Sequence, residues 1–131
     1  GNAETLEVCE RHSLASLARS PLGMGLLTGK FAPDSVLPED DVRSGWSFRE
    51  GDRAEQLRKL QSIRDILASG GRTLAQGALA WLWARSPSII PIPGFKTVAQ
   101  VEENIAAMKF GALSPDQMRQ IDAILSRNPV V

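Results

Sequence analysis

The sequence has no tyrosine, one histidine and one cysteine among its 131 residues. The single cysteine, Cys9, cannot form a disulfide within the chain. The first residues also lack the basic, apolar and small-residue order of a secretory signal, so we expect a cytoplasmic location. Without tyrosine, the chain cannot supply a tyrosine and histidine pair for proton transfer.

An excess of charge of either sign is also missing, because 15 Lys and Arg residues balance 15 Asp and Glu residues. No whole-chain field therefore attracts nucleic acid or an anionic membrane. No apolar run approaches the roughly 18 residues of a membrane span. Apolar residues still make up 43 % of the chain, which predicts a soluble globular domain that binds neither nucleic acid nor a membrane.

Local signals predict a mostly helical chain with two short strands. Asn2 is a candidate cap for a first helix that turns Leu6 and Cys9 inward. Short apolar runs at residues 14–18 and 89–94 are typical of buried strands. Four pairs resemble capping boxes and predict helix starts: Asp52 with Glu55, Thr73 with Gln76, Thr97 with Gln100, and Ser114 with Gln117.

The periodicity of the last two helices predicts which residues face the core. We expect Val98, Val101, Ile105 and Met108 to point inward from the first of them. Between the strands, residues 31–52 form a long irregular loop, with Trp46 and Phe48 as apolar anchors. A loop of this length is usually functional or mobile. Its acidic run, Glu39, Asp40 and Asp41, has no histidine nearby, so we interpret it as a solvated surface and predict no metal site.

Strands that are separated by helices indicate parallel pairing through crossovers, and therefore an α/β fold. Two parallel strands cannot cover their own faces and edges. A complete (β/α)₈ barrel takes roughly 250 residues, about twice the length of this chain. We therefore interpret the chain either as a piece of a larger barrel or as a module that completes its core by association.

Two segments have the chemistry of an anion site. The first runs from Ser20 through Gly23 and Gly25 to Lys30, where glycines let backbone amides approach a diphosphate and the lysine adds positive charge. In the second, Lys96 precedes a helix start, whose dipole favours an anion. Two structural alternatives stay open: the glycines can serve only to shape a turn, and Gln100 can serve only as a helix cap.

These segments, Ser-Pro-Leu-Gly-Met-Gly at 20–25 with Gly-Lys-Phe at 29–31, and Ile-Pro-Ile-Pro-Gly at 90–94, resemble the C-terminal part of the aldo-keto reductases. The resemblance also includes Gln100, Glu103 and Asn104, and the helix from Thr73. It covers nearly the whole chain, so residues 1–131 are interpreted as the last two strand-helix units of a (β/α)₈ TIM barrel.

The resemblance implies a site for NADP(H) along the carboxyl ends of the strands. Ser20, Leu22, Gly23, Gly25 and Lys30 resemble the loop around the pyrophosphate. Gly94 and Lys96 resemble the start of the adenosine phosphate site. Gln100, Glu103 and Asn104 resemble the residues on the 2′-phosphate and adenine side.

The family's catalytic Asp, Tyr, Lys and His come from the first four strands, which this chain does not contain. Because the chain has no tyrosine, the isolated chain is expected to be catalytically incompetent, and we assign it no catalytic residue. The leading hypothesis is thus the NADPH-binding portion of a reductase of aldehydes or ketones, whose partners are the nicotinamide dinucleotide and the missing N-terminal barrel half. The alternative is a non-catalytic helical module that self-associates through exposed barrel faces.

Overall fold

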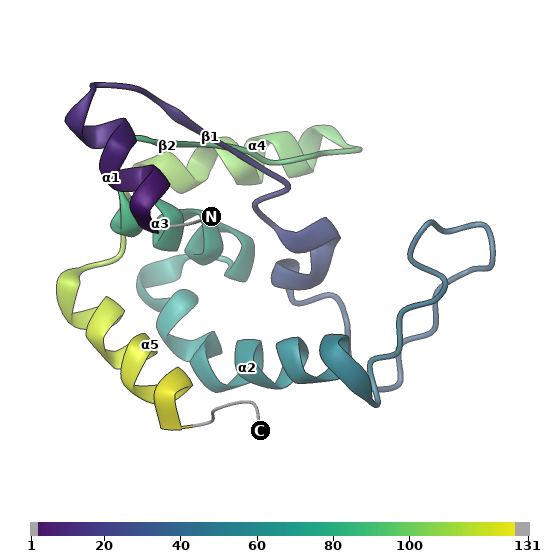
Figure 1. The fold of residues 1–131 in the computed structure, drawn as a ribbon. Helices are drawn as coiled ribbons and strands as arrows, with labels where there is room; N and C mark the ends of the chain where they lie inside the picture. The colour runs from purple at the N-terminus through teal and green to yellow at the C-terminus, as the bar shows by residue number, and fades with distance from the viewer. Residues whose placement is uncertain (1–2, 128–131) are drawn as a thin grey trace.

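The computed structural model describes residues 3–127, in which five α-helices and two short strands follow one another (Figure 1). The predicted cap Asn2 lies outside the described residues. The α-helices and strands are α1 (Ala3–Arg11), β1 (Ser16–Arg19), α2 (Gly51–Leu67), α3 (Leu74–Arg85), β2 (Ile89–Ile92), α4 (Val98–Ala106) and α5 (Pro115–Arg127). Three short 3₁₀ segments join them: η1 (Gly23–Thr28), η2 (Ser69–Gly71) and η3 (Ala107–Lys109).

The two strands pair in parallel, with Ser16 opposite Ile89 and Arg19 opposite Ile92. The chain passes from β1 to β2 through α2 and α3, which confirms the predicted crossover (Figure 1). β1 begins two residues later than predicted, because the Leu14 amide donates to the Cys9 carbonyl at 2.8 Å and so belongs to the turn after α1. β2 ends at Ile92, before Pro93, which has no amide to donate.

The core lies around α3, which packs against α2, α5 and β2. Every residue from Leu74 to Ala80 is buried, as the nearly uniform apolar sequence of this helix predicts. α2 contributes Leu57, Leu60 and Leu67, which are spaced along one face of the helix and are buried. In α5, Ile121 is fully buried against the same cluster.

The long loop differs from the prediction in its bounds, whereas the predicted anchors Trp46 and Phe48 are confirmed by their packing against Phe31. It ends at Glu50, because α2 begins at Gly51, and residues 51 and 52 are helical. Asp52 therefore lies inside the first turn of α2, and the predicted cap with Glu55 does not form. The loop is anchored by aromatic packing: Phe31 stacks on Phe48 with 4.7 Å between ring centroids, and both rings are buried.

The predicted inner face of α4 is wrong for Val98, Ile105 and Met108, which are 74 %, 62 % and 72 % exposed. No residue of α4 is fully buried, although Val101 is half-buried. The periodicity identifies an apolar face correctly, but residues 3–127 contain no element that covers it. The first helix shows the same pattern, since Leu6 and Cys9 are only half-buried.

Candidate functional site

The glycine-rich segment after β1 folds into a tight left-handed turn at the carboxyl end of the strand. Gly23, Met24 and Gly25 have φ values of 56°, 55° and 92°. The amide of Gly23 donates to the Ser20 carbonyl at 2.9 Å, and the amide of Gly25 donates to the Leu22 carbonyl at 3.0 Å. Both of these amides therefore already have partners inside the turn.

Because Gly25 has no side chain, it leaves room for the end of the Lys30 side chain. A Cβ atom at Gly25 would lie 2.7 Å from the Lys30 Cε and 2.8 Å from its Nζ. Only glycine leaves that volume open, and its φ of 92° is also one that other residues avoid. The turn thus holds the Lys30 ammonium directly against its backbone.

Arg43, in the long loop, joins this turn and was missed by the sequence analysis. Its Nη1 donates to the Met24 carbonyl at 2.8 Å, although 19 residues separate them. Its Nε and Nη2 donate to the two carboxylate oxygens of Asp41 at 2.8 Å and 2.6 Å, as a bidentate pair. Both side chains are largely buried, at 15 % and 19 % exposure.

This pairing corrects the interpretation of Asp41 as part of a solvated acidic run. The hydrogen bonds from Arg43 hold the pKa of the Asp41 carboxyl well below its usual range. The same bonds raise the pKa of Arg43. The pair therefore stays ionised at neutral pH and fastens the long loop to the glycine turn. An Asp and an Arg two residues apart were the available signal, but nothing local pointed to Met24 as their third partner.

Lys30 lies among cations from three segments of the chain. Burial lowers its pKa, and the nearby charges of Arg43 and Lys96 lower it further, while Asp41 opposes the shift. The Lys30 Nζ is 5.0 Å and the Arg43 Cζ 5.5 Å from the centre of the Phe31 ring. The charge of Lys96, which follows β2, thus acts on Lys30, which follows β1, the parallel neighbour of β2. We call Lys30, Arg43 and Lys96 the cation cluster.

The start of α4 lies beside this cluster and forms the predicted capping box. The Thr97 Oγ1 accepts the Gln100 amide at 3.2 Å. The Gln100 Oε1 in turn accepts the amides of Lys96, at 2.6 Å, and Thr97, at 3.3 Å. The structural alternative for Gln100 is therefore confirmed as one role of the side chain. Gly94 is exposed, and a Cβ there would meet nothing within 4 Å.

Glu103 and Asn104 lie further along α4, and both are half-buried. The Glu103 carbonyl accepts a hydrogen bond from Gln76 of α3 at 2.9 Å. The Asn104 Nδ2 is buried and has no hydrogen-bond partner among the described residues. Of the remaining predicted residues, Ser20 has a left-handed φ of 53°, and Leu22 is half-buried where η1 begins.

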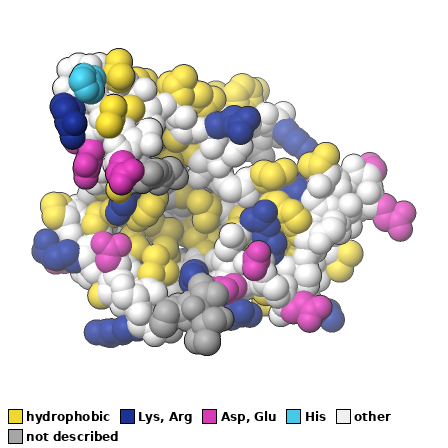
Figure 2. Space-filling model, in the orientation of Figure 1, with side chains coloured by type: hydrophobic (Ala, Val, Ile, Leu, Met, Phe, Trp, Pro, Cys, Tyr) yellow, Lys and Arg dark blue, Asp and Glu magenta, His cyan; other side chains and the backbone are white. Residues whose placement is uncertain are grey.

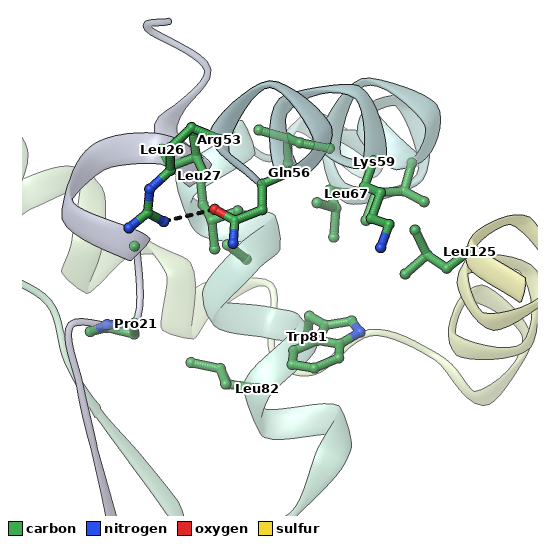
Figure 3. A pocket seen from close by; sticks show the side chains of 14 residues that line it. Pro21, Leu26, Leu27, Arg53, Gln56, Lys59, Leu67, Trp81, Leu82 and Leu125 are labelled. Carbon is green, nitrogen blue, oxygen red and sulfur yellow. Dashed lines mark hydrogen bonds between the residues drawn. The ribbon is translucent and has the colours of Figure 1, made fainter. Parts of the chain in front are cut away.

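A separate apolar pocket of about 400 Å³ lies between η1, α2 and α3. Trp81, Leu82 and Leu125 lie around it, and Arg53, Gln56 and Lys59 of α2 supply polar groups (Figure 3). The face shown in Figure 2 has a hollow with hydrophobic side chains in it. Arg53 donates to Gln56 at 2.7 Å, and Lys59 is paired with Glu55 at 3.0 Å. Each of these three polar side chains therefore already has a polar partner on α2.

Two further types of site were sought in residues 3–127. No group of three or more His, Cys, Asp or Glu side chains is placed to hold a metal ion there. Within the same range, no helix has both the length and the apolar character needed to cross a membrane.

Comparison with known proteins gives one consistent family. The model of the Aldo/keto reductase family matches residues 2–126. An aldo-keto reductase of Schizosaccharomyces pombe, yakc, whose name specifies NADP(+), is 32 % identical over 105 residues, covering 79 % of this chain and 31 % of that protein. A chloroplastic pyridoxal reductase of Arabidopsis thaliana is 31 % identical over 126 residues, covering 96 % and 33 %.

A solved structure shows the same arrangement. The glycerol dehydrogenase from Gluconobacter oxydans has a TM-score of 0.77 and 28 % identity, with 96 % of this chain and 39 % of that chain covered. The chain thus spans about a third of the length of these relatives and matches their C-terminal part. The helical chain with its two parallel strands has the fold of a fragment of a TIM barrel.

Proposed function

Because this chain belongs to the aldo-keto reductase family, we propose that it forms the NADPH-binding part of an oxidoreductase that reduces an aldehyde or ketone. The observation that carries the proposal is the cation cluster. Lys30, Arg43 and Lys96 come from three segments, and the Asp41 carboxylate that acts on Lys30 is already paired with Arg43. A dinucleotide diphosphate with a 2′-phosphate supplies the anions that such a cluster lacks.

Each proposed contact follows from the position of a side chain. Lys30 and Arg43 hold the diphosphate beside the turn that Ser20, Leu22, Gly23 and Gly25 form. Gly94 leaves open space at the end of β2, where no side chain obstructs a bound molecule. Through its side chain, Lys96 pairs with the 2′-phosphate, since its own amide is engaged by Gln100. The remaining contacts, on the adenine side, are assigned to Gln100, Glu103 and Asn104.

NADPH would supply the hydride, and the chain would bind and orient it. Asp41 keeps Arg43 in place for this task, because its two oxygens fix the plane of the guanidinium. The proton donor must come from outside the chain, which has no tyrosine. We therefore propose that the isolated chain binds cofactor without turning over a carbonyl substrate.

Fluorescence titration tests the proposal, since bound NADPH quenches tryptophan emission. We expect saturable quenching by NADPH and weaker binding of NADH, which lacks the 2′-phosphate. Lys30→Met should weaken the binding of NADPH by about tenfold, which is the effect of losing one charge-assisted hydrogen bond. Lys59→Met is the matched control, because Lys59 is paired with Glu55 on α2 and lies outside the cluster. Absence of saturable binding, or equal losses in both variants, would refute the proposal.

A second candidate function rests on the outer face of the sheet. Leu17, Ile90 and Ile92 are 64 %, 50 % and 50 % exposed. In a barrel this face and the free edge of β1 are covered by further strands. We propose that they bind the N-terminal barrel half or, in its absence, a second copy of the chain.

A further inference from the structure

Gln76 is a buried polar residue that joins the two helices beside the candidate site. It is 6 % exposed and lies in the first turn of α3. Its Oε1 accepts the Thr73 amide at 2.9 Å, which completes the capping box. Its Nε2 donates to the Glu103 carbonyl of α4 at 2.9 Å. A helix cap requires only the first bond, so the second needs an explanation.

The Glu103 carbonyl is available because α4 tightens at its end. In an α-helix this oxygen would accept the amide of Ala107. The Ala107 amide instead donates to the carbonyls of Asn104 and Ile105, where α4 continues into η3. Glu103 is thus left without that partner, and the Gln76 carboxamide takes its place.

The bond matters for position because α4 has little other packing. None of its residues is fully buried, and the side chains of Val98 and Ile105 are mostly exposed. A partly buried hydrogen bond to a helix with little buried surface fixes where that helix lies. This hydrogen bond directly fixes the position of Glu103, and Asn104 is the next residue in the chain.

We infer that Gln76 is a positioning residue for the adenine end of the cofactor site, an inference that rests on the proposed function. Gln76 touches no cofactor in this scheme. It holds the last turn of α4 so that Glu103 and Asn104 keep their places relative to the cation cluster. Loss of the Gln76–Glu103 hydrogen bond should therefore weaken the binding of ligands that carry adenosine. It should leave the binding of ligands that carry only the diphosphate unchanged.

The chain contains a matched control in Gln117 of α5. The Ser114 amide donates to its Oε1 at 2.9 Å, and its own amide donates to the Ser114 Oγ at 3.2 Å, as in the α3 cap. Its Nε2 also reaches another element, the Ser69 Oγ, at 2.8 Å. Gln117 thus has the same residue type and capping geometry as Gln76, but it contacts no predicted cofactor residue.

The test compares Gln76→Glu with Gln117→Glu. Glutamate still accepts the capping amide, but it has no donor for the Glu103 carbonyl. At Gln117 the Ser69 hydroxyl, which donates to the Ile66 carbonyl at 2.7 Å, can turn and donate to the new carboxylate instead. We expect Gln76→Glu to weaken the binding of NADPH and 2′,5′-ADP by roughly tenfold, as for the loss of one hydrogen bond. The binding of inorganic pyrophosphate should be unchanged. Gln117→Glu should change the dissociation constants of all three ligands by less than twofold.

Hydrogen exchange of the α4 amides gives a second measurement that does not depend on a ligand. Exchange should accelerate in Gln76→Glu and stay unchanged in Gln117→Glu. This inference fails, and the proposed function stands, if the wild-type chain binds the ligands but the two variants behave alike. The same holds if Gln76→Glu loses as much affinity for pyrophosphate as for 2′,5′-ADP. If the wild-type chain binds none of the three ligands, the proposed function fails and this inference with it.

Discussion

Replacement of Gly77 by alanine tests the packing of α3 against α2. Gly77 lies within α3 and is buried. A Cβ atom there would lie 2.1 Å from the Leu67 carbonyl oxygen and 2.6 Å from its carbon. Both atoms are backbone, so no flexible side chain can move aside. The end of α2 would have to retreat by about 0.9 Å to reach even a 3.0 Å separation.

Two effects of opposite sign compete in this variant. Alanine is favoured over glycine in a helix by about 1 kcal/mol. Overpacking a close-packed core costs about 1–3 kcal/mol, and the upper part of that range applies where backbone obstructs. The net expectation is a loss of about 1–2 kcal/mol in the free energy of unfolding. For a domain of this size, that corresponds to a fall in Tm of about 4–8 °C.

Thermal unfolding followed by circular dichroism measures this loss. Gly45→Ala is the control, because a Cβ at Gly45 meets nothing within 4 Å and its φ is not in the left-handed region. That variant should be unchanged or slightly more stable, because alanine reduces the entropy of the unfolded chain. A Gly77→Ala chain that is as stable as wild type would refute the close approach of the two helices.

Three further predictions concern charge and association. Lys30→Met should raise Tm at pH 7, because folding lowers the pKa of Lys30. The Lys30 charge therefore opposes folding at any pH below the folded-state pKa. This destabilisation disappears above the ordinary pKa of 10.5, where the side chain is neutral in both states. The Tm gap from wild type should thus close by pH 11, and a lower Tm of the variant at pH 7 would contradict the assignment. In fluorescence titrations, Lys96→Glu should weaken the binding of NADPH more than the binding of NADH. Equal weakening of both would place Lys96 away from the 2′-phosphate. Sedimentation velocity should show a wild-type chain that associates at micromolar concentration and an Ile92→Lys chain shifted toward monomer; a compact wild-type monomer would count against association through the exposed sheet face.

Helix starts were predictable because their signals are local. The boxes at Thr73, Thr97 and Ser114 all form, since each needs only a side chain and an amide three residues apart. The box at Asp52 fails although it has the same spacing. Gly51, with a φ of 75°, is the first residue of the helix, two residues too early for Asp52 to act as the cap.

Features that depend on distant partners were predicted less well. The apolar face of α4 was identified, but its burial depends on a neighbour that the described residues do not include. Arg43 was missed because its bond to Met24 exists only once Phe31 and Phe48 stack and fold the long loop back. The parallel strands were predicted correctly, because helices separate them in the sequence and such a crossover pairs strands in parallel.

The lowered pKa of Lys30 connects the stability of the chain to its proposed function. Three cations from separate segments are held together in the unliganded chain, and Asp41, the carboxylate beside them, is already bound to Arg43. Such an arrangement opposes folding, because it concentrates like charge at a partly desolvated position. An anion bound there would reverse the effect by raising the pKa of Lys30, so that binding draws in a proton at alkaline pH. Residues that destabilise a chain without its ligand and stabilise it with the ligand are typical of binding sites rather than of structural cores.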